Sequence, residues 1–194
     1  MFFVSMIEDA GIELSDNSRL EELLRRLAGG DKDALAELYH QTRAAIYGFS
    51  LSITKNAADS EDVLQDTYIK AWTNATNYTA KGTPMAWLLT IAKNLSLMKL
   101  RDKKRRQDLE PEEWDMNFSI PDTAENTEDR HFIMEALKVL GEEERQIIML
   151  HAVSGLKHRE IADLLQMALP TVLSKYHRAL KKLRIFVEGE EKND

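Results

Sequence analysis

Hydrophobic residues recur at the three- to four-residue spacing of α-helices from Leu20 to about Arg106. The pattern predicts four helices in this half of the chain. The first ends at Gly29–Gly30, the second follows a cap at Asp31 or Asp33, the third runs from Asp59 or Ser60 to about Trp72, and the fourth starts at Thr83–Pro84. The positions expected to face a core are Leu20, Leu23, Leu24, Leu27, Leu35, Leu38, Tyr39, Ile46, Phe49, Ile53, Val63, Ile69, Trp72, Leu88, Ile91, Leu95 and Met98.

Helical patterning resumes at Arg130 and continues through a helix after Gly141. Two amphipathic helices follow within residues 155–184, and Pro170 fits the first position of the second helix, where a backbone N–H needs no partner. This arrangement predicts a helix-turn-helix. Its outward face would carry Ser174, Lys175, His177, Arg178, Lys181 and Lys182.

The intervening segment, residues 107–129, is acidic, lacks periodicity and contains Pro111 and Pro121, so it is interpreted as a linker. The predicted fold class is all-α, with two small helical domains joined by an acidic flexible linker and a helix-turn-helix at the end of the second. The expected boundaries are an N-terminal extension 1–16, a first domain 17–106, the linker 107–129, a second domain 130–188 and a polar tail 189–194.

Composition narrows the class of protein. The formal net charge of -7 over 194 residues disfavours a protein that coats nucleic acid by charge alone, so DNA contacts would come from local basic patches. The chain has no cysteine, which excludes disulfides and thiolate metal sites. The apolar start, Met1 to Ile7, lacks a basic leader and is too short for a signal core, and no stretch is long enough to span a bilayer. A cytoplasmic protein without stable membrane insertion is expected.

Enzyme chemistry has little support in the sequence. The five histidines have no metal-binding spacing and are expected to be isolated surface residues, and neither a phosphate-binding glycine loop nor a nucleophile elbow occurs. The expectation is a protein that is not an enzyme and that uses no cofactor or metal.

Two other surfaces could carry function. The third predicted helix exposes an acidic strip, Glu61, Asp62, Gln65 and Asp66, which suits a basic partner helix but is also typical of a solvated face. The fourth carries a mixed row, Trp87, Thr90, Asn94 and Arg101, whose aromatic and amide groups suit unpaired bases, although Trp87 is equally consistent with a core position. The basic run that follows suits phosphates. The helix-turn-helix alone fits either a DNA-binding helix or an ordinary solvated surface.

Taken together, these segments resemble extracytoplasmic-function sigma factors, small bacterial sigma factors with sigma domains 2 and 4. SEDVLQDTYIKAW resembles the core-binding motif, PMAWLLTIAKNLSLMKLRDKKRR the promoter-melting and minus-ten segment, and GLKHREIADLLQMALPTVLSKYHRALKKL the minus-thirty-five reader. The resemblance implies a bacterial transcription initiation factor that binds RNA polymerase core, through the clamp helices of its largest (β′) subunit and the β flap, and recognises promoter DNA. It also implies an anti-sigma factor as partner and a role in a stress or envelope-signal response.

The resemblance implies three sets of site residues. The polymerase-binding residues would be Glu61, Asp62, Gln65, Asp66 and Ile69. The minus-ten residues, which would capture a flipped base and hold the nearby backbone, would be Tyr78, Lys81, Trp87, Lys93, Asn94, Lys99, Arg101, Lys103 and Lys104. The minus-thirty-five residues would be Thr171, Ser174, Lys175, His177, Arg178 and Lys181.

The chain departs from the family pattern at three positions of the helix-turn-helix. Gln166 and Pro170 replace common glycines, and Leu173 replaces a basic residue, so upstream recognition would lean on DNA shape or a thymine methyl group. Two alternatives remain at this point: a stand-alone helix-turn-helix regulator, and an all-helical metal-dependent hydrolase, which the histidine spacing disfavours.

Overall fold

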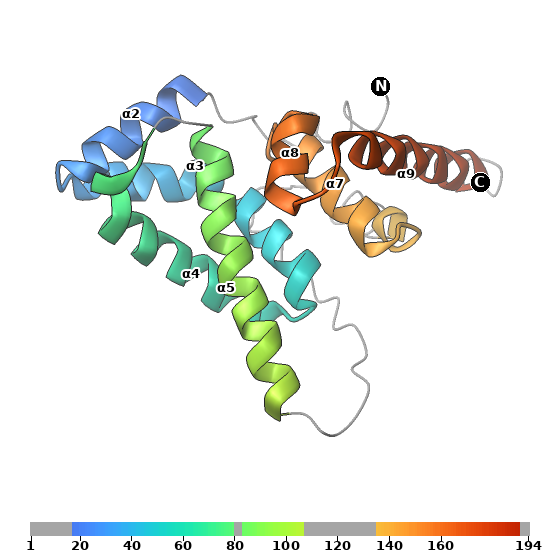
Figure 1. The fold of residues 1–194 in the computed structure, drawn as a ribbon, viewed down its shortest axis with the longest axis horizontal. Coiled ribbons are helices and arrows are strands. Elements are labelled where there is room, and N and C mark those ends of the chain that lie inside the picture. Colours follow the sequence, from blue (N-terminus) through green and yellow to red (C-terminus); the bar gives the residue numbers. More distant parts are fainter. Residues whose placement is uncertain (1–16, 80–82, 107–134, 191–194) are drawn as a thin grey trace. The chain divides into compact units, whose positions relative to one another are not determined.

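The computed structural model describes residues 17–79, 83–106 and 135–190, apart from the side chains of Lys104, Arg106 and Glu190. Every regular element in these ranges is a helix, as the all-α prediction requires. The helices form two compact units, one containing α2, α3, α4, η1 and α5 and the other α7, α8 and α9 (Figure 1). The predicted N-terminal extension, the acidic linker and residues 130–134, where the second domain is predicted to begin, lie outside the described residues.

Helix α2 (Asn17–Ala28) buries the four leucines that the sequence pattern assigned to its core face. The turn after it contains Gly30, whose φ of 85° lies in the left-handed region that glycine adopts without steric cost. Asp31, rather than Asp33, caps α3 (Lys32–Thr54), because its Oδ1 accepts hydrogen bonds from the backbone N–H groups of Asp33 (2.9 Å) and Ala34 (3.3 Å).

Helix α3 packs against α2, α4 and α5 and is buried along most of its length. Its buried threonine and serine hydroxyl groups are hydrogen-bonded within the protein. Thr42 Oγ1 contacts Leu38 O and Tyr68 Oη, both at 2.7 Å, and Ser50 Oγ donates to Ile46 O at 2.8 Å. These bonds avoid the cost of unsatisfied buried hydroxyls, so a helix with polar residues can lie in the centre of the unit.

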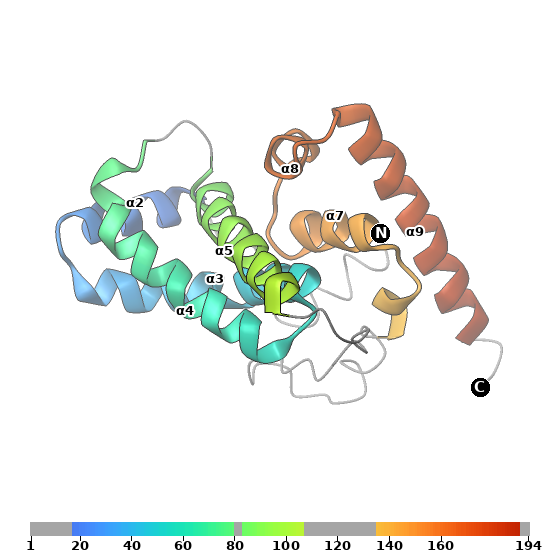
Figure 2. The same cartoon turned by 60° about the horizontal axis from the view of Figure 1, so that its bottom comes forward.

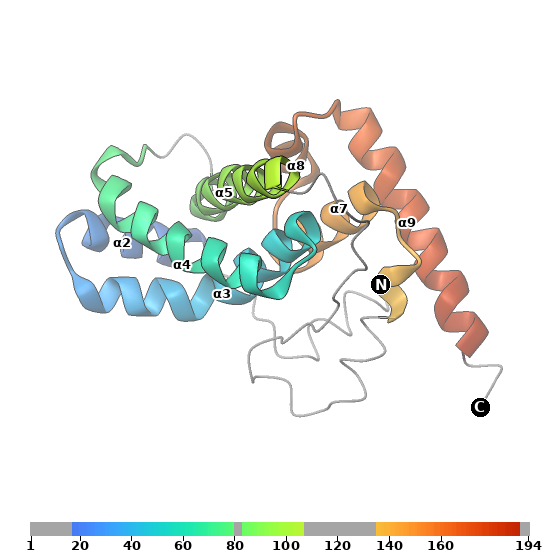
Figure 3. The same cartoon turned by 90° about the horizontal axis from the view of Figure 1, so that it is seen from below.

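Helix α4 (Ala57–Asn74) starts two residues before the predicted Asp59 because Asn56 caps it, accepting a bond from the Asp59 N–H at 2.9 Å. Figure 3 shows α4 beside α3. A short 3-10 turn, η1 (Ala75–Asn77), ends this segment, and α5 (Pro84–Arg106) begins at the predicted residue.

Two core predictions in this unit are wrong. Ile69 is 60% exposed and Met98 is 50% exposed, because the neighbouring helices cover other residues of α4 and α5 and leave these two side chains at the surface. The buried apolar residues of these helices are Val63, Leu64, Tyr68, Ala71, Met85, Leu88, Leu89, Ala92 and Leu95. Trp72 and Ile91 are partly buried.

The second unit contains α7 (Glu142–Ala152), α8 (His158–Leu165) and α9 (Leu169–Glu190), shown in Figure 2. Residues from the short helical segment 135–138 and from α7 and α9 share one core, made of Ala136, Leu137, Leu140, Ile148, Ala179 and Leu183. Helices α8 and α9 are the predicted helix-turn-helix. Pro170 is the second residue of α9 rather than the first, but it still lies in the first turn, where no intrahelical N–H bond is lost.

None of the described helices is long and apolar enough to cross a membrane.

Candidate nucleic-acid and protein interfaces

The acidic strip of α4 lies at the surface of the first unit. Glu61, Asp62 and Gln65 are exposed and Asp66 is partly buried. Ile69, one turn beyond Gln65, extends the strip with an apolar side chain. An exposed isoleucine beside carboxylates forms a surface that suits an amphipathic partner carrying cations and apolar groups.

An apolar groove of about 390 Å³ adjoins this strip between α3 and α4. Its lining residues are Lys32, Leu35, Tyr68, Ile69 and Trp72. Ile69 belongs to both features, so the acidic strip and the apolar groove form one continuous surface.

Lys99 on α5 reaches across to the acidic strip. Its Nζ donates to Asp62 Oδ2 at 2.6 Å and lies 4.0 Å from Asp59 Oδ1. The hydrogen bond to Asp62, with the nearby charges of Asp62, Asp59 and Asp66, raises the pKa of Lys99 against the opposing effect of burial. A predicted DNA contact is thus paired with a predicted polymerase contact.

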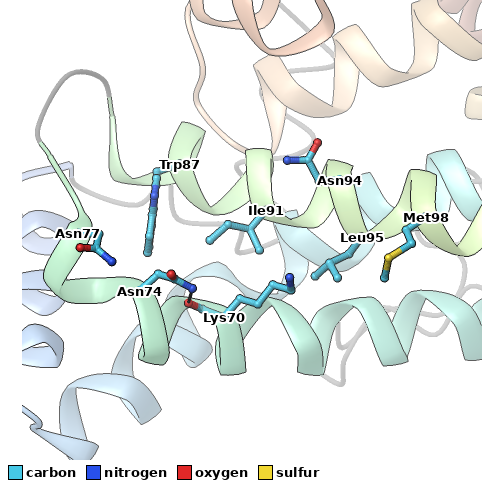
Figure 4. Close-up of a pocket in the computed structure, with 8 residues that line it drawn as sticks. All are labelled: Lys70, Asn74, Asn77, Trp87, Ile91, Asn94, Leu95 and Met98. Carbon is cyan, nitrogen blue, oxygen red and sulfur yellow. Dashed lines mark hydrogen bonds between the residues drawn. The ribbon is translucent and has the colours of Figure 1, made fainter.

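A cleft of about 400 Å³ separates α5 from the end of α4 and η1. Its lining residues are Lys70, Asn74, Asn77, Trp87, Ile91, Asn94, Leu95 and Met98. Figure 4 shows Trp87 and Ile91 pointing from α5 toward α4, whereas the amide of Asn94 points away from α4 at the rim. Aromatic and apolar walls with amides at the edge suit the face and edge of an unpaired base.

The ring of Tyr78 packs edge-on against Trp87, with ring centroids 5.3 Å apart and an interplanar angle of 64°. Burial raises the pKa of Tyr78, with a smaller contribution from the charge of Glu21. Tyr78 therefore contacts Trp87 as a neutral phenol ring.

The remaining predicted minus-ten cations differ in their surroundings. Arg101 is exposed, Lys103 is partly buried, and burial lowers the pKa of the partly buried Lys93. Lys81 lies outside the described residues, as does the side chain of Lys104.

The predicted upstream reader forms one side of α9. Thr171, Ser174, His177, Arg178 and Lys181 are exposed there, as expected. Lys175 departs from the expectation, because its side chain is 21% exposed and its Nζ lies 2.5 Å from Oε2 of Glu143 on α7. Lys182 Nζ likewise lies 2.6 Å from Oε2 of the buried Glu144. Burial would raise the pKa of Glu144, but the hydrogen bonds from Lys182 and the Gly141 N–H outweigh it and lower the pKa.

Two of the histidines expected to be isolated are not. The rings of His151 and His158 stack with centroids 4.4 Å apart, and Tyr176 meets both edge-on at 5.0 and 4.6 Å. His151 Nδ1 is hydrogen-bonded to Leu156 O at 2.9 Å. The described residues give no hydrogen-bond partner to the buried Nε2 of His158, and they contain no group of three or more side chains placed to hold a metal. Burial lowers the pKa of His158, and the charges of His151 and His177 lower it further.

Comparison with known proteins identifies the family of this chain. Residues 38–106 match Sigma-70 region 2 and residues 133–183 match Sigma-70 region 4. The ECF RNA polymerase sigma factor SigK of Mycobacterium bovis (strain BCG / Pasteur 1173P2) is 33% identical over 174 residues, which cover 87% of this chain and 93% of SigK. The chain belongs to the ECF family of RNA polymerase sigma factors. A sigma factor binds RNA polymerase and directs it to promoters for transcription initiation. The alternative of a stand-alone helix-turn-helix regulator is therefore not favoured.

Further relatives of this sigma factor agree. The SigK protein of Mycobacterium ulcerans (strain Agy99) is 32% identical over 171 residues, covering 85% of this chain and 91% of that protein. Among solved structures, CnrH in complex with the cytosolic domain of CnrY has a TM-score of 0.59 at 23% identity, covering 90% of this chain and 99% of that one. RpoE in complex with the anti-sigma factor NepR from Bartonella quintana has a TM-score of 0.57 at 23% identity, covering 79% and 96%. These two structures share the fold of this sigma factor.

Sequence reasoning missed the carboxylate partners of Lys99 and Lys175, and it missed the apolar groove between α3 and α4. Asp62 and Lys99 are 37 residues apart in the sequence, so no local pattern reveals their contact. Leu35 and Trp72 were assigned to a core, and both are instead partly buried in the wall of the groove.

Proposed function

We propose that the acidic strip and the apolar groove together bind the clamp helices of the polymerase β′ subunit. The observation that carries this assignment is Ile69, which is 60% exposed at the junction of the two features. Leaving a large apolar side chain in water is unfavourable, and a partner that buries it beside four polar residues gains both apolar area and charge complementarity.

A pull-down of the full chain by core polymerase tests this assignment. Asp66→Arg reverses charge within the strip and is expected to abolish retention by the core enzyme. Glu21→Arg makes the same charge change at an exposed site on α2 and is expected to retain binding. Loss of retention in both variants, or in neither, would contradict the assignment.

We propose that the cleft between α4 and α5 receives a base flipped out of the nontemplate strand. Trp87 supplies a face on which a base can stack, and the amides of Asn74 and Asn94 lie at the edge of the cleft. The exposed Arg101, which is on α5 like Trp87, can bind the phosphate backbone of the strand. Asn94→Ala is expected to impair promoter opening more than closed-complex formation, as measured by permanganate footprinting of unpaired thymines. Thr90→Ala is the matched control, because the exposed Thr90 hydroxyl bonds to Ala86 O within α5.

The exposed side of α9 is proposed to contact the minus-thirty-five element. Hydroxyl, imidazole and cationic groups along one helix face suit base edges and phosphates of a major groove. Run-off transcription with core polymerase on genomic fragments, followed by sequencing of RNA 5′ ends, identifies the promoters. On such a promoter, Lys175→Ala is expected to weaken upstream binding and reduce the salt slope by about one unit.

An anti-sigma factor is proposed as a further partner, because both solved relatives are complexes: RpoE with an anti-sigma factor and CnrH with the cytosolic domain of CnrY. Exposed Ile69 and Met98 offer such a partner apolar contacts on the first unit. Binding there would exclude core polymerase, so the two proteins should compete for the full chain in a pull-down. Docking of the second unit on the β flap is an expectation from the family resemblance.

A further inference from the structure

Two histidines of the second unit connect its three helices at one point. His151 lies in the last turn of α7 and His158 is the first residue of α8, and their rings stack with centroids 4.4 Å apart. Tyr176 of α9 meets both rings edge-on, and its neighbours along α9 are the predicted DNA contacts Lys175 and His177. These three rings, the aromatic cluster, therefore link α7 and α8 to the helix that carries the DNA-facing residues.

The aromatic cluster accommodates His158 only as a neutral ring. The Nε2 atom of His158 is buried and has no hydrogen-bond partner among the described residues, so a protonated ring would bury an unsatisfied N–H donor. His158 also begins α8, where the helix dipole disfavours a cation. Protonation is therefore expected to expel the ring from the cluster.

The charged groups around His158 add to this effect. Burial lowers the pKa of His158, and the charges of His151 and His177 lower it further, so the ring takes up a proton only as the pH falls below the ordinary value of 6.5. The titratable groups that face it are His151 from α7 and Tyr176 and His177 from α9, with Lys157, Arg159 and Glu160 on its own segment.

We propose that His151 and His158 are positioning residues for the minus-thirty-five reader, and that protonation of His158 weakens its binding to DNA. The proposal rests on the proposed function, in which the exposed side of α9 contacts the minus-thirty-five element. Once His158 leaves the cluster, Tyr176 loses the ring at 4.6 Å and the first turn of α8 loses its ring contact with α7. The angle between α8 and α9, on which docking in the major groove depends, is then no longer fixed.

The predicted pH dependence has the opposite sign to that of a simple basic surface. The exposed His177 gains positive charge as the pH falls, and this charge alone would strengthen contact with phosphates. For His158, the DNA-binding state holds the ring neutral. Affinity is therefore highest above the pKa of His158 in the folded unit and is lost below it.

Fluorescence anisotropy of the full chain with a labelled duplex tests the proposal. The duplex carries the upstream element of a promoter identified by run-off transcription, and the titration is repeated from pH 7.5 to pH 5.5 at fixed salt. Wild-type affinity is expected to fall about two- to fivefold, within the limit of about tenfold per pH unit that one proton sets. Far-UV circular dichroism should show unchanged helix content, and a parallel loss of helix would attribute the fall to unfolding and overturn the proposal.

Three variants separate the aromatic cluster from the DNA-facing histidine. His158→Phe keeps a ring in the cluster but cannot take up a proton, so it should lose the weakening and bind more tightly than wild type at pH 5.5. His177→Gln should show a steeper fall, because the opposing gain of charge is absent. His40→Phe, at an exposed position of α3, is the matched control and should fall as wild type does.

A measurement on the wild-type chain does not depend on how the variants fold. Because DNA binding favours the neutral ring, binding near pH 6 should release protons to the buffer. Titration calorimetry in two buffers of different ionisation enthalpy measures this release. Net proton uptake by both wild type and His177→Gln would overturn the proposal.

The outcomes distinguish this proposal from the proposed function. If the duplex binds at pH 7.5 and Arg178→Ala weakens it, but acidification weakens wild type and His158→Phe equally or not at all, the positioning role is wrong and the minus-thirty-five assignment stands. If the duplex binds at no pH, that assignment fails and the positioning role fails with it.

Discussion

Lys175 Nζ on α9 lies 2.5 Å from Glu143 Oε2 on α7, so a predicted phosphate contact of the helix-turn-helix is neutralised within its own unit. Glu143 lies in the first turn of α7, where the helix dipole also favours a carboxylate. The free protein therefore presents less positive charge along α9 than its sequence suggests.

Removing this carboxylate should strengthen upstream DNA binding. Glu143→Gln frees Lys175 from its partner, and affinity for a duplex carrying the minus-thirty-five element is expected to rise about two- to fourfold, as for loss of an exposed ion pair. Anisotropy titration of the full chain at fixed salt measures this. Glu142→Gln, which makes the same charge change one residue away, controls for the overall field, and an equal rise in both variants would contradict a specific role for Glu143.

A charge at the exposed isoleucine should affect binding but not stability. Ile69→Glu is expected to weaken core-polymerase binding at least tenfold, because it places a carboxylate where the partner buries an apolar side chain. Its thermal unfolding should match wild type, since Ile69 already lies in water. Val139→Glu, at a 40% exposed position of the other unit, is expected to leave polymerase binding unchanged. A large drop in thermal stability for Ile69→Glu would point to a packing role instead.

The turn of the helix-turn-helix is strained at Gln166. Its φ of 56° and ψ of 43° lie in the left-handed region, which glycine occupies without cost. Gln166→Gly is expected to stabilise the second unit by about 0.5–1 kcal/mol, after allowing for the greater freedom of glycine in the unfolded chain. Gln146→Gly, in the middle of α7, should destabilise the unit by about 1 kcal/mol. Hydrogen exchange of α8 and α9 amides measures both, and the same sign for the two variants would refute the strain.

Stability of the second unit should depend on pH through His158. The pKa of this histidine in the folded unit lies below the ordinary value of 6.5, because burial disfavours the charged ring, so the unfolded chain binds more protons in that range. The free energy of unfolding is therefore expected to be highest near pH 7 and above. It should decline as the pH falls through 6.5 toward the pKa of His158 in the folded unit.

His158→Phe keeps an aromatic ring against His151 and Tyr176 but cannot take up a proton. It should flatten the decline in hydrogen-exchange protection of α7–α9 between pH 7 and pH 5. His40→Phe, at an exposed position of α3, should leave that decline as in wild type. Equal slopes for wild type and His158→Phe would show that His158 does not titrate in this range.

Local sequence signals predicted the positions and ends of most described helices. The leucines of α2 and the start of α5 at Thr83–Pro84 were predicted, and the cap of α3 was narrowed to Asp31 or Asp33, because periodicity and capping act over a few residues. Ile69 and Met98 were assigned to the core because helical spacing identifies an apolar stripe without showing whether a neighbouring helix covers it.

The sequence predicts which residue types form the candidate sites, but it does not predict which of these residues contact one another. The sequence shows acidic residues on one helix and lysines on another, whereas the pairing of Lys99 with Asp62 and of Lys175 with Glu143 depends on how the helices pack. The stack of His151 on His158 is a tertiary contact of the same kind: α7 contributes one ring and α8 the other.

The central position of α3 has a consequence for where transcription begins. Helices α4 and α5 both pack on α3, and its buried hydroxyls, such as those of Thr42 and Ser50, are bonded inside the unit. α3 therefore supports both α4, which carries the surface proposed to bind polymerase, and α5, which forms one wall of the cleft proposed to receive a base. A change in the bulk of these α3 side chains would move α4 relative to α5. We expect such a variant to start RNA synthesis at displaced positions on promoters that it still recognises.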